Sequence, residues 1–566
     1  MLHNEIMLIG NVKVIDGTTI LTCDRLTVFL KSDDTKVEKK TDPANDFGDS
    51  SAMLKGISRI LADGDVLLKR RPENLRSGNA AQYARAEQLE YEFDSGRIIL
   101  TGEDELPTLT QDNYSLCGKR IELLRFSRKA FVKGSCKITE FSDSKDKKTA
   151  LRTITSNQAD FDGVANLNVF SGNVTVTDND AVLKCDRMRV FLKPVNADQK
   201  LKEKNQEFSP VSGAQDLDRI FCEGNVSIVS IPKAAKMQAD KKSKQQLPST
   251  LNARRAELNY RADKLVFYDD VRINHQGDTL NCERLDLFLK DSAYPEKKNE
   301  KSSGGVALGG KGANDKTLSK VIASGKVTMK DHQSDLSTEL MTLDFKELPP
   351  GTSQTPGMFA AGSVQLIRIA CDGKVVASSF PGTARTKTVQ KRMLKAEHAM
   401  SDLLKNRSEF HKNVQIMEEN NTLSCSNMYV FTGAAPEIKP AAAVTATTPE
   451  DDPDADPFAL PATENTAPSR IALSDGIDLE RIVCKNQVVL ANKDKKGEFT
   501  YAGGDTAIYT VKTGEIVITA DAPSRPYLRR DGRIQYSDII QGNLQTEELS
   551  GSGNVQVVTD KSEKKE

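Results

Sequence analysis

The sequence predicts an all-β fold built from repeated antiparallel hairpins. Apolar residues alternate with polar ones in short runs, and this period of two is typical of strands with one buried face. Each run is interrupted by a Gly or another small or polar residue and then resumes, usually with Val. A Gly at such a break favours a bulge or kink, because it takes a positive φ at little cost. The breaks fall at Gly10, Gly64, Gly134, Gly172, Gly224, Asp269, Gly325, Gly362, Lys412, Asn486 and Gly553.

Two longer modules contain this phrase. The first is the segment 171–193, which recurs at 10–31 and more loosely at 269–290, with a polar turn between two predicted strands. The second aligns without a gap between 84–102 and 502–520, so that Tyr91 falls on Tyr509 and Ile98 on Ile516. Both modules have the pattern of a β-hairpin, with two predicted strands joined by a short polar turn. Repetition of this kind predicts a stack that grows in one dimension.

Composition fits a thin, continuous core. Hydrophobic residues make up 38% of the chain and aromatic residues 5%, and Trp is absent. The 79 basic and 80 acidic residues nearly cancel, which argues against a dedicated nucleic-acid binder. We find no apolar run of the roughly 18 to 20 residues that a membrane helix needs, and we therefore expect a soluble chain.

Long polar segments separate the modules, at 32–51, 194–215, 233–249, 291–316 and 433–469. Each exceeds the roughly 12 to 15 residues at which structureless loops become uncommon in compact domains. We interpret them as disordered insertions at hairpin ends. The sequence therefore predicts a run of β-repeats over residues 1–432, a low-complexity linker at 433–470 and further β-repeats over 471–566.

The nine cysteines are odd in number, so they cannot all pair within the chain. Cys222 and Cys484 occupy the repeat position that Ala62 and Ala323 fill elsewhere. A position that alternates between Cys and Ala is typical of a small buried site. Four further cysteines, Cys23, Cys185, Cys282 and Cys425, also share one repeat position. Structural core is the favoured interpretation of both sets, with disulfide or metal roles as alternatives.

No catalytic motif emerges. Gly305, Gly310 and Lys311 have the spacing of a phosphate-binding loop, but Gly312 stands where a Ser or Thr is needed. The acidic cluster near Asp451 lacks the Gly turn and distal Glu of a calcium loop. The five histidines show no ligand spacing. The sequence therefore predicts a protein that is not an enzyme and has no cofactor or metal.

The phrase Gly-Asn-Val-x-Val, followed by an apolar-Cys-Asp-Arg segment and Val-Phe-Leu, resembles the organic-solvent-tolerance-like family, which includes lipopolysaccharide-transport periplasmic bridge proteins. The segments IILTGEDELP and IVITADAPSRP look like further phrases of that family. The resemblance implies an elongated, V-shaped β-jellyroll of two facing antiparallel sheets. It also implies lipopolysaccharide transport across the periplasm to the outer membrane, with the acyl chains of lipid A held in an apolar groove.

The resemblance further implies the periplasm as location. The stretch Met1–Gly10 shows no secretory signal and the repeat begins almost at once, so we expect an N-terminus that has been cut short. Open sheets leave unpaired edge strands, which can be extended by another chain. We therefore expect edge-strand pairing with other β-jellyroll transport proteins or a head-to-tail homo-oligomer, and lipopolysaccharide or a similar amphiphile as ligand.

The resemblance implies a groove-lining role only for the apolar residues at inward-facing positions of the repeat. These are Val12, Val14, Leu26, Val28, Val66, Leu68, Val174, Val176, Val190, Val226, Ile228, Val271, Ile273, Leu287, Val327, Val414, Ile416, Val488, Leu490, Val555 and Val557. For any one of them, simple packing against its neighbours is an equal alternative. Two other functions stay open, namely a structural scaffold or interaction protein of the cell envelope with a filled interior, and a polysaccharide-acting enzyme with paired carboxylates in a cleft.

Overall fold

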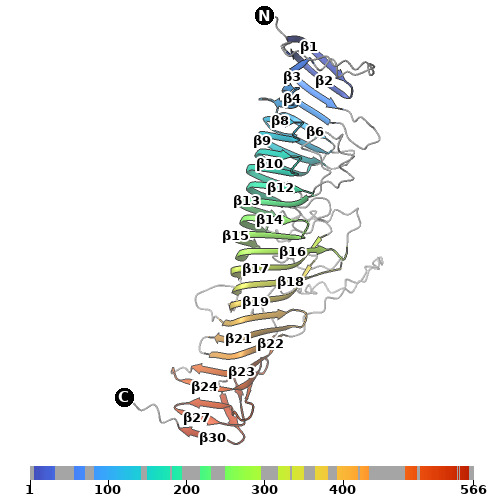
Figure 1. Ribbon diagram of the computed structural model, residues 1–566. Helices are drawn as coiled ribbons and strands as arrows, with labels where there is room; N and C mark the ends of the chain where they lie inside the picture. Colours follow the sequence, from blue (N-terminus) through green and yellow to red (C-terminus); the bar gives the residue numbers. More distant parts are fainter. Residues whose placement is uncertain are drawn as a thin grey trace, which may run out of the picture. The chain divides into compact units, whose positions relative to one another are not determined.

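The computed structural model describes residues 5–31, 56–70, 82–111, 113–141, 150–178, 181–193, 217–230, 249–294, 316–331, 334–349, 364–379, 392–418, 421–432, 479–493, 497–544, 546 and 548–559. Over these residues the chain consists of strands joined by turns and loops (Figure 1). They include no helix long and apolar enough to cross a membrane. The predicted all-β, antiparallel fold is confirmed.

The chain forms two compact units. The first comprises Met1–Asp240, Asn252–Ala262 and Val306–Ala313, and the second comprises Lys241–Leu251, Asp263–Gly305 and Asn314–Glu566. The linker predicted at 433–470 lies outside the described residues. The predicted division of the chain there stays a prediction.

The first unit holds strands β1 to β13 and most of β14. Their bounds are β1 Glu5–Asp16, β2 Thr19–Leu30, β3 Ile57–Arg70, β4 Gln82–Glu92, β5 Arg97–Thr101, β6 Thr108–Gln111, β7 Tyr114–Cys117, β8 Arg120–Leu124, β9 Lys129–Phe141, β10 Ala150–Asp162, β11 Leu167–Asp178, β12 Ala181–Leu192, β13 Leu217–Ser230 and β14 Thr250–Asn259.

The second unit holds strands β15 to β30. Their bounds are β15 Lys264–His275, β16 Asp278–Asp291, β17 Lys316–Lys330, β18 Ser334–Glu347, β19 Val364–Ser379, β20 Arg392–Asp402, β21 Arg407–Glu418, β22 Asn421–Thr432, β23 Leu479–Lys493, β24 Phe499–Thr510, β25 Glu515–Thr519, β26 Tyr527–Arg530, β27 Arg533–Tyr536, β28 Ile539–Asn543, β29 Glu548–Ser552 and β30 Gln556–Thr559.

A corner divides most long strands into two arms. In β1 the register to β2 shifts between Ile9 and Val12, and the two residues between them, Gly10 and Asn11, have φ values of 88° and 45°. We call the side of β1 with residues 5–9, and everything paired in register with it, arm A, and the side with residues 12–16 arm B. The same double positive φ recurs at Gly64, Gly134, Gly172, Gly224, Asp269, Gly325, Lys412, Asn486 and Gly553 and the residue after each.

One predicted break, at Gly362, lies outside the described residues. The corner of β19 falls at Gly373 and Lys374, with φ values of 78° and 48°. There the register to β20 shifts between Asp372 and Val375. The sequence around Gly373 also has alternating apolar residues on both sides, and the break predicted at Gly362 stays a prediction.

Each corner is completed by a polar side chain of the neighbouring strand. Opposite Gly10 and Asn11, β2 contributes the single extra residue Asp24, whose side chain lies against Gly64 of β3. In β12 the same place is taken by Asp186, whose carboxylate accepts a 2.9 Å hydrogen bond from the amide of Asn225. The corner is therefore a β-bulge of two residues against one. This explains the Gly-polar pair that marks the repeat.

In each unit one long strand is followed by two short ones. Strand β4 pairs with β5 in arm A and with β6 in arm B; β5 then pairs with β8, β6 with β7, and both pairs end on β9. In the second unit β24 pairs in the same way with β25 and β26, which lead to β28 and β27. We call these arrangements split rungs. They coincide with the segments 84–102 and 502–520, whose gapless match predicted equivalent structure.

Candidate lipid-binding lining

The inward side chains of arm A form two parallel rows across the first unit. The row next to the corner, here the corner row, follows the strand register and is buried throughout. It consists of Leu26, Ala62, Leu89, Leu100, Ile121, Val132, Ala159, Phe170, Met188 and Cys222. These residues form a continuous apolar core along the bend, as the period of two predicted.

The second row of arm A, two residues further from the corner, is the rim row. It consists of Val28, Ile60, Tyr91, Ile98, Leu123, Ala130, Phe161, Asn168, Val190 and Ile220. From Val28 to Leu123 its side chains are half-buried, whereas Ala130, Phe161, Val190 and Ile220 are buried. In the first unit the rim row is therefore half-buried over β2 to β8 and buried from β9 onward except at the polar Asn168.

Two phenylalanines account for the closure. Phe161 in the rim row and Phe170 in the corner row are each 2% exposed. Their rings meet edge to face, with centroids 5.9 Å apart. Opposite them lie the small side chains of Ala130 and Ala159, which leave room for the rings. Aromatic rings fill far more volume than the Ile and Leu of the open section, so the interior between the arms is occupied here.

Most of the side chains predicted to line a groove are buried in the core. Those that are buried are Val12, Leu26, Val66, Val174, Val176, Val190, Val226, Ile228, Val271, Ile273, Leu287, Val327, Val414, Val488 and Leu490. Val28, Leu68 and Ile416 are half-buried.

Three predicted lining residues face solvent instead. Val14, Val555 and Val557 are 36%, 51% and 60% exposed. Strand β1 pairs only with β2, and β30 only with β27, over the described residues. A neighbouring strand therefore covers these residues on one side at most. Their assignment to the lining of a groove stays a prediction.

The half-buried rim row includes residues that the repeat phrase missed. Tyr91, Ile98 and Leu123 lie on β4, β5 and β8 of the first split rung. None of these three strands contains a Gly-polar corner, so the repeat phrase does not mark them. The alternation itself was visible, since Leu89 precedes Tyr91 by two residues and Leu100 follows Ile98 by two.

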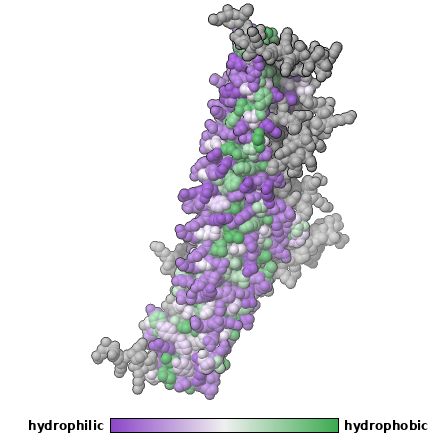
Figure 2. All heavy atoms as spheres, viewed as in Figure 1, coloured by the Kyte–Doolittle hydropathy of each residue, from purple (hydrophilic) through white to green (hydrophobic). Residues whose placement is uncertain are grey.

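Hydrophobic side chains form a band on the visible face of each unit, bordered by hydrophilic ones (Figure 2). Several carboxylates of the first unit accept hydrogen bonds from neighbouring strands or turns. On β8, the Glu122 carboxylate accepts a 2.7 Å hydrogen bond from Nε of Arg97 on β5, and this bond lowers the pKa of Glu122. On β4, backbone N–H groups of Glu105 and Glu103 donate to Glu87 and lower its pKa. Hydrogen bonds to the ionised carboxylates account for both shifts.

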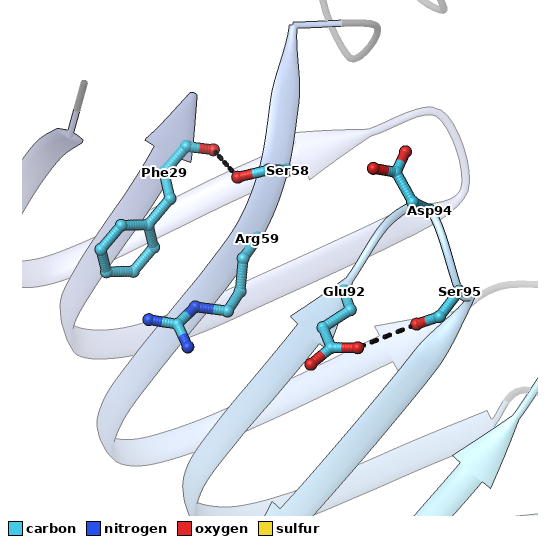
Figure 3. A pocket seen from close by; sticks show the side chains of 6 residues that line it. All are labelled: Phe29, Ser58, Arg59, Glu92, Asp94 and Ser95. Atoms are coloured by element: carbon cyan, nitrogen blue, oxygen red, sulfur yellow. Dashed lines mark hydrogen bonds between the residues drawn. The ribbon is translucent and has the colours of Figure 1, made fainter. Parts of the chain in front are cut away.

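A shallow open pocket lies on the outward face of arm A in the first unit (Figure 3). Its polar groups already have partners. Ser58 donates a 3.0 Å hydrogen bond to the carbonyl of Phe29, and the Arg59 guanidinium lies 4.3 Å from the centroid of the Phe29 ring. Arg59 also donates to Glu90 at 3.1 Å. The lining residues are Phe29, Ser58, Arg59, Glu92, Asp94 and Ser95. Because Arg59 is paired, we do not assign an anion site to this pocket.

The fold and its lining define an all-β repeat protein with a two-armed, apolar interior. Residues 1–127 match the family described as "LptA/(LptD N-terminal domain) LPS transport protein". For these residues the resemblance to the organic-solvent-tolerance-like family is confirmed. The match covers strands β1 to β8, the section with the half-buried rim row.

One solved structure similar to this chain is that of LptH, the LptA homologous periplasmic component of the lipopolysaccharide transport device from Pseudomonas aeruginosa. The sequence identity is 9% and the TM-score 0.20, and the match covers 30% of this chain and 93% of LptH. No curated protein matches the sequence.

Proposed function

We propose that this chain binds lipopolysaccharide without catalysis and carries it across the periplasm to the outer membrane, with the acyl chains of lipid A against the inner lining. The observation that carries the proposal is the half-buried apolar rim row of β2 to β8, within the segment that matches the transport family. Half-buried Ile and Leu side chains gain by further burial, and each buried CH2 of an acyl chain contributes about 0.8 kcal/mol.

Binding begins, in this proposal, in the section β2 to β8. There Ile60, Ile98 and Leu123 of arm A are half-buried, and Leu68 and Leu109 of arm B are half-buried as well. Beyond β9 the predicted lining residues Val174 and Val190 are packed. Movement of a lipid past β9 would therefore require the two arms to part and the Phe161–Phe170 contact to open.

The partners follow from the outermost strands. Strand β1 exposes Ile6, Met7, Leu8 and Ile9 along an edge that has no further partner among the described residues. Such an edge presents backbone donors and acceptors together with apolar side chains, and it can be extended by a strand of another chain. We propose that other β-jellyroll transport proteins, or a second copy of this chain, pair there.

A photoactivatable lipid A probe tests the ligand. We expect the full chain to be labelled within residues 57–124, and Ile60→Asp combined with Ile98→Asp to reduce labelling at least tenfold, because the charges oppose acyl burial. Leu61→Asp is the matched control. Leu61 is half-buried on the same strand but points to the opposite face, so labelling should persist. Circular dichroism verifies that each variant is folded.

A structural scaffold is the second candidate, and the packed interior from β9 onward favours it. A scaffold with a filled interior predicts that the lipid A probe does not label the wild-type chain. Absence of labelling in the folded wild-type chain would support the scaffold and end the lipid-carrier proposal. Labelling that is equal in the wild type and in the Ile60/Ile98 variant would show that any bound lipid lies elsewhere.

A further inference from the structure

Two cysteines in the first unit meet across the corner. Cys185 lies in arm B of β12 and Cys222 in arm A of the adjacent strand β13. They are 4% and 0% exposed, respectively. Inward side chains on either side of the bend converge, and the two thiols are hydrogen-bonded to each other. Both cysteines are free in this structure.

The second unit repeats the arrangement. Cys425 on β22 and Cys484 on β23 are buried and hydrogen-bonded to each other. Their placement in the register is the same, since Met428 lies opposite Cys484 as Met188 lies opposite Cys222. The contact is thus a property of this position in the repeat.

Other copies of this repeat position show that packing at the corner does not require a second cysteine. Cys23 on β2 and Cys282 on β16 are buried, but the next strands carry Ala62 and Ala323 at the second position. A small apolar side chain is therefore sufficient for packing there. A second thiol beside the first occurs in the two pairs described, Cys185 with Cys222 and Cys425 with Cys484.

We propose that Cys185 with Cys222, and Cys425 with Cys484, are disulfide sites that fasten neighbouring strands at the corner of each unit. Formation of each bond removes two protons and two electrons from a pair of thiols. A disulfide oxidant takes up the electrons: one thiolate attacks its S–S bond and releases one thiol, and the second thiolate then attacks the mixed disulfide and releases the other. With oxidised glutathione, each bond yields two molecules of reduced glutathione.

In the second pair a hydrogen bond from the Cys484 thiol lowers the pKa of Cys425. The two thiols therefore interact directly, and either can be the first nucleophile once it is deprotonated. Burial of both residues means that reaction takes place as the hairpins fold or open locally.

Each bond would close a long stretch of chain. The first closes the segment from 185 to 222 and the second the segment from 425 to 484. Cross-links across long segments restrict the unfolded chain most. We therefore expect oxidised protein to show a higher thermal midpoint than reduced protein, by several degrees.

The test uses the full chain, refolded in a glutathione redox buffer and then alkylated in denaturant. With two disulfides formed, five of the nine cysteines (nine minus four) should react with iodoacetamide. Peptide mass spectrometry should recover the linked pairs 185–222 and 425–484. Alkylation of all nine, or linkage of these cysteines to other partners, would overturn the proposal.

Two variants sharpen the result. Cys222→Ala places the residue of position 62 in β13 and should fold; six cysteines should then react, including Cys185. Cys282→Ala removes a cysteine outside both pairs, so four should react while both links persist. An unchanged thermal midpoint on reduction of the wild type would show that the bonds, though formed, do not fasten the strands. The readout does not depend on lipid binding.

Discussion

The sections β2 to β8 and β9 to β13 of the first unit share corners and strand register but differ in their interior. The rim row is half-buried in the first section and mostly buried in the second. Ile60 and Ile98 stand in one, Phe161 in the other, with Phe170 beside it. Side-chain volume at a few inward positions, and not the backbone, therefore decides whether the interior is open.

The second unit supports this conclusion. Its split rung has the same topology as that of the first unit, and Ile516 aligns with Ile98. Yet Ile516 is 1% exposed, whereas Ile98 is half-buried. A split rung by itself thus does not open the lining. The open section of β2 to β8 is a specific property of the segment that matches the transport family.

The largest effect on the free energy of unfolding is expected from removing the Phe161 ring. Phe161→Ala should lower the free energy of unfolding by about 3–5 kcal/mol, because a fully buried aromatic side chain leaves a cavity. Ile60→Ala, at the same row in the open section, should cost only about 1–2 kcal/mol, since part of that side chain already contacts water. Urea denaturation of both variants measures the difference. Equal losses would contradict the distinction between the two sections.

The corner was predictable from sequence, whereas the openness of the lining was not. Gly10 and Gly172 stand between two runs of period two, and their positive φ values follow from that pattern. The closure depends on which inward residues become neighbours across strands. Phe161 and Phe170 are close in sequence, but Ala130 faces Phe161 only through the register of β9 with β10. A single strand's pattern does not contain that information.

The candidate lining shows the same limit. The inward phase of Val174 and Val226 was predicted and both are buried, but phase does not distinguish a packed core from a groove. Val14 has the correct phase and is nevertheless exposed, because among the described residues its strand has one pairing partner. Exposure depends on which strands lie beside a residue. The sequence alone therefore predicts which face of a strand a side chain is on, but not whether other strands bury it.

A smaller effect is expected at the corners themselves. Gly172→Ala, in the closed section, places a Cβ 2.6 Å from Nδ2 of Asn157 at a φ of 79°. Gly10→Ala meets nothing within 4 Å at a φ of 88°. The left-handed backbone costs either alanine about 1–2 kcal/mol, and only Gly172→Ala adds a steric clash. Thermal melts should therefore rank Gly172→Ala as the less stable variant, and the reverse order would refute the close corner contact.

The smallest effect concerns the ion pair that fastens β5 to β8 on the outward face of the open section. Glu122→Gln reproduces the second unit, where Gln541 lies opposite Val517 as Glu122 lies opposite Ile99, so the variant should fold. Arg97 lowers the pKa of Glu122 from its ordinary 4.5 in the folded state. The pair therefore stabilises the fold above that pH, and the stabilisation is lost as the pH falls through the lowered pKa.

At pH 7 the Glu122→Gln variant should lose about 1 kcal/mol or less, because solvent still screens this part-buried ion pair. Below the lowered pKa of Glu122 it should match the wild type, because Glu122 is then protonated in both states of the wild-type chain. Urea midpoints across this pH range check the prediction, with the exposed Glu103→Gln as the control for net charge. A loss that is the same at both pH values would assign the contribution of Glu122 to packing and not to its charge. In that case the two split rungs would differ in lining alone.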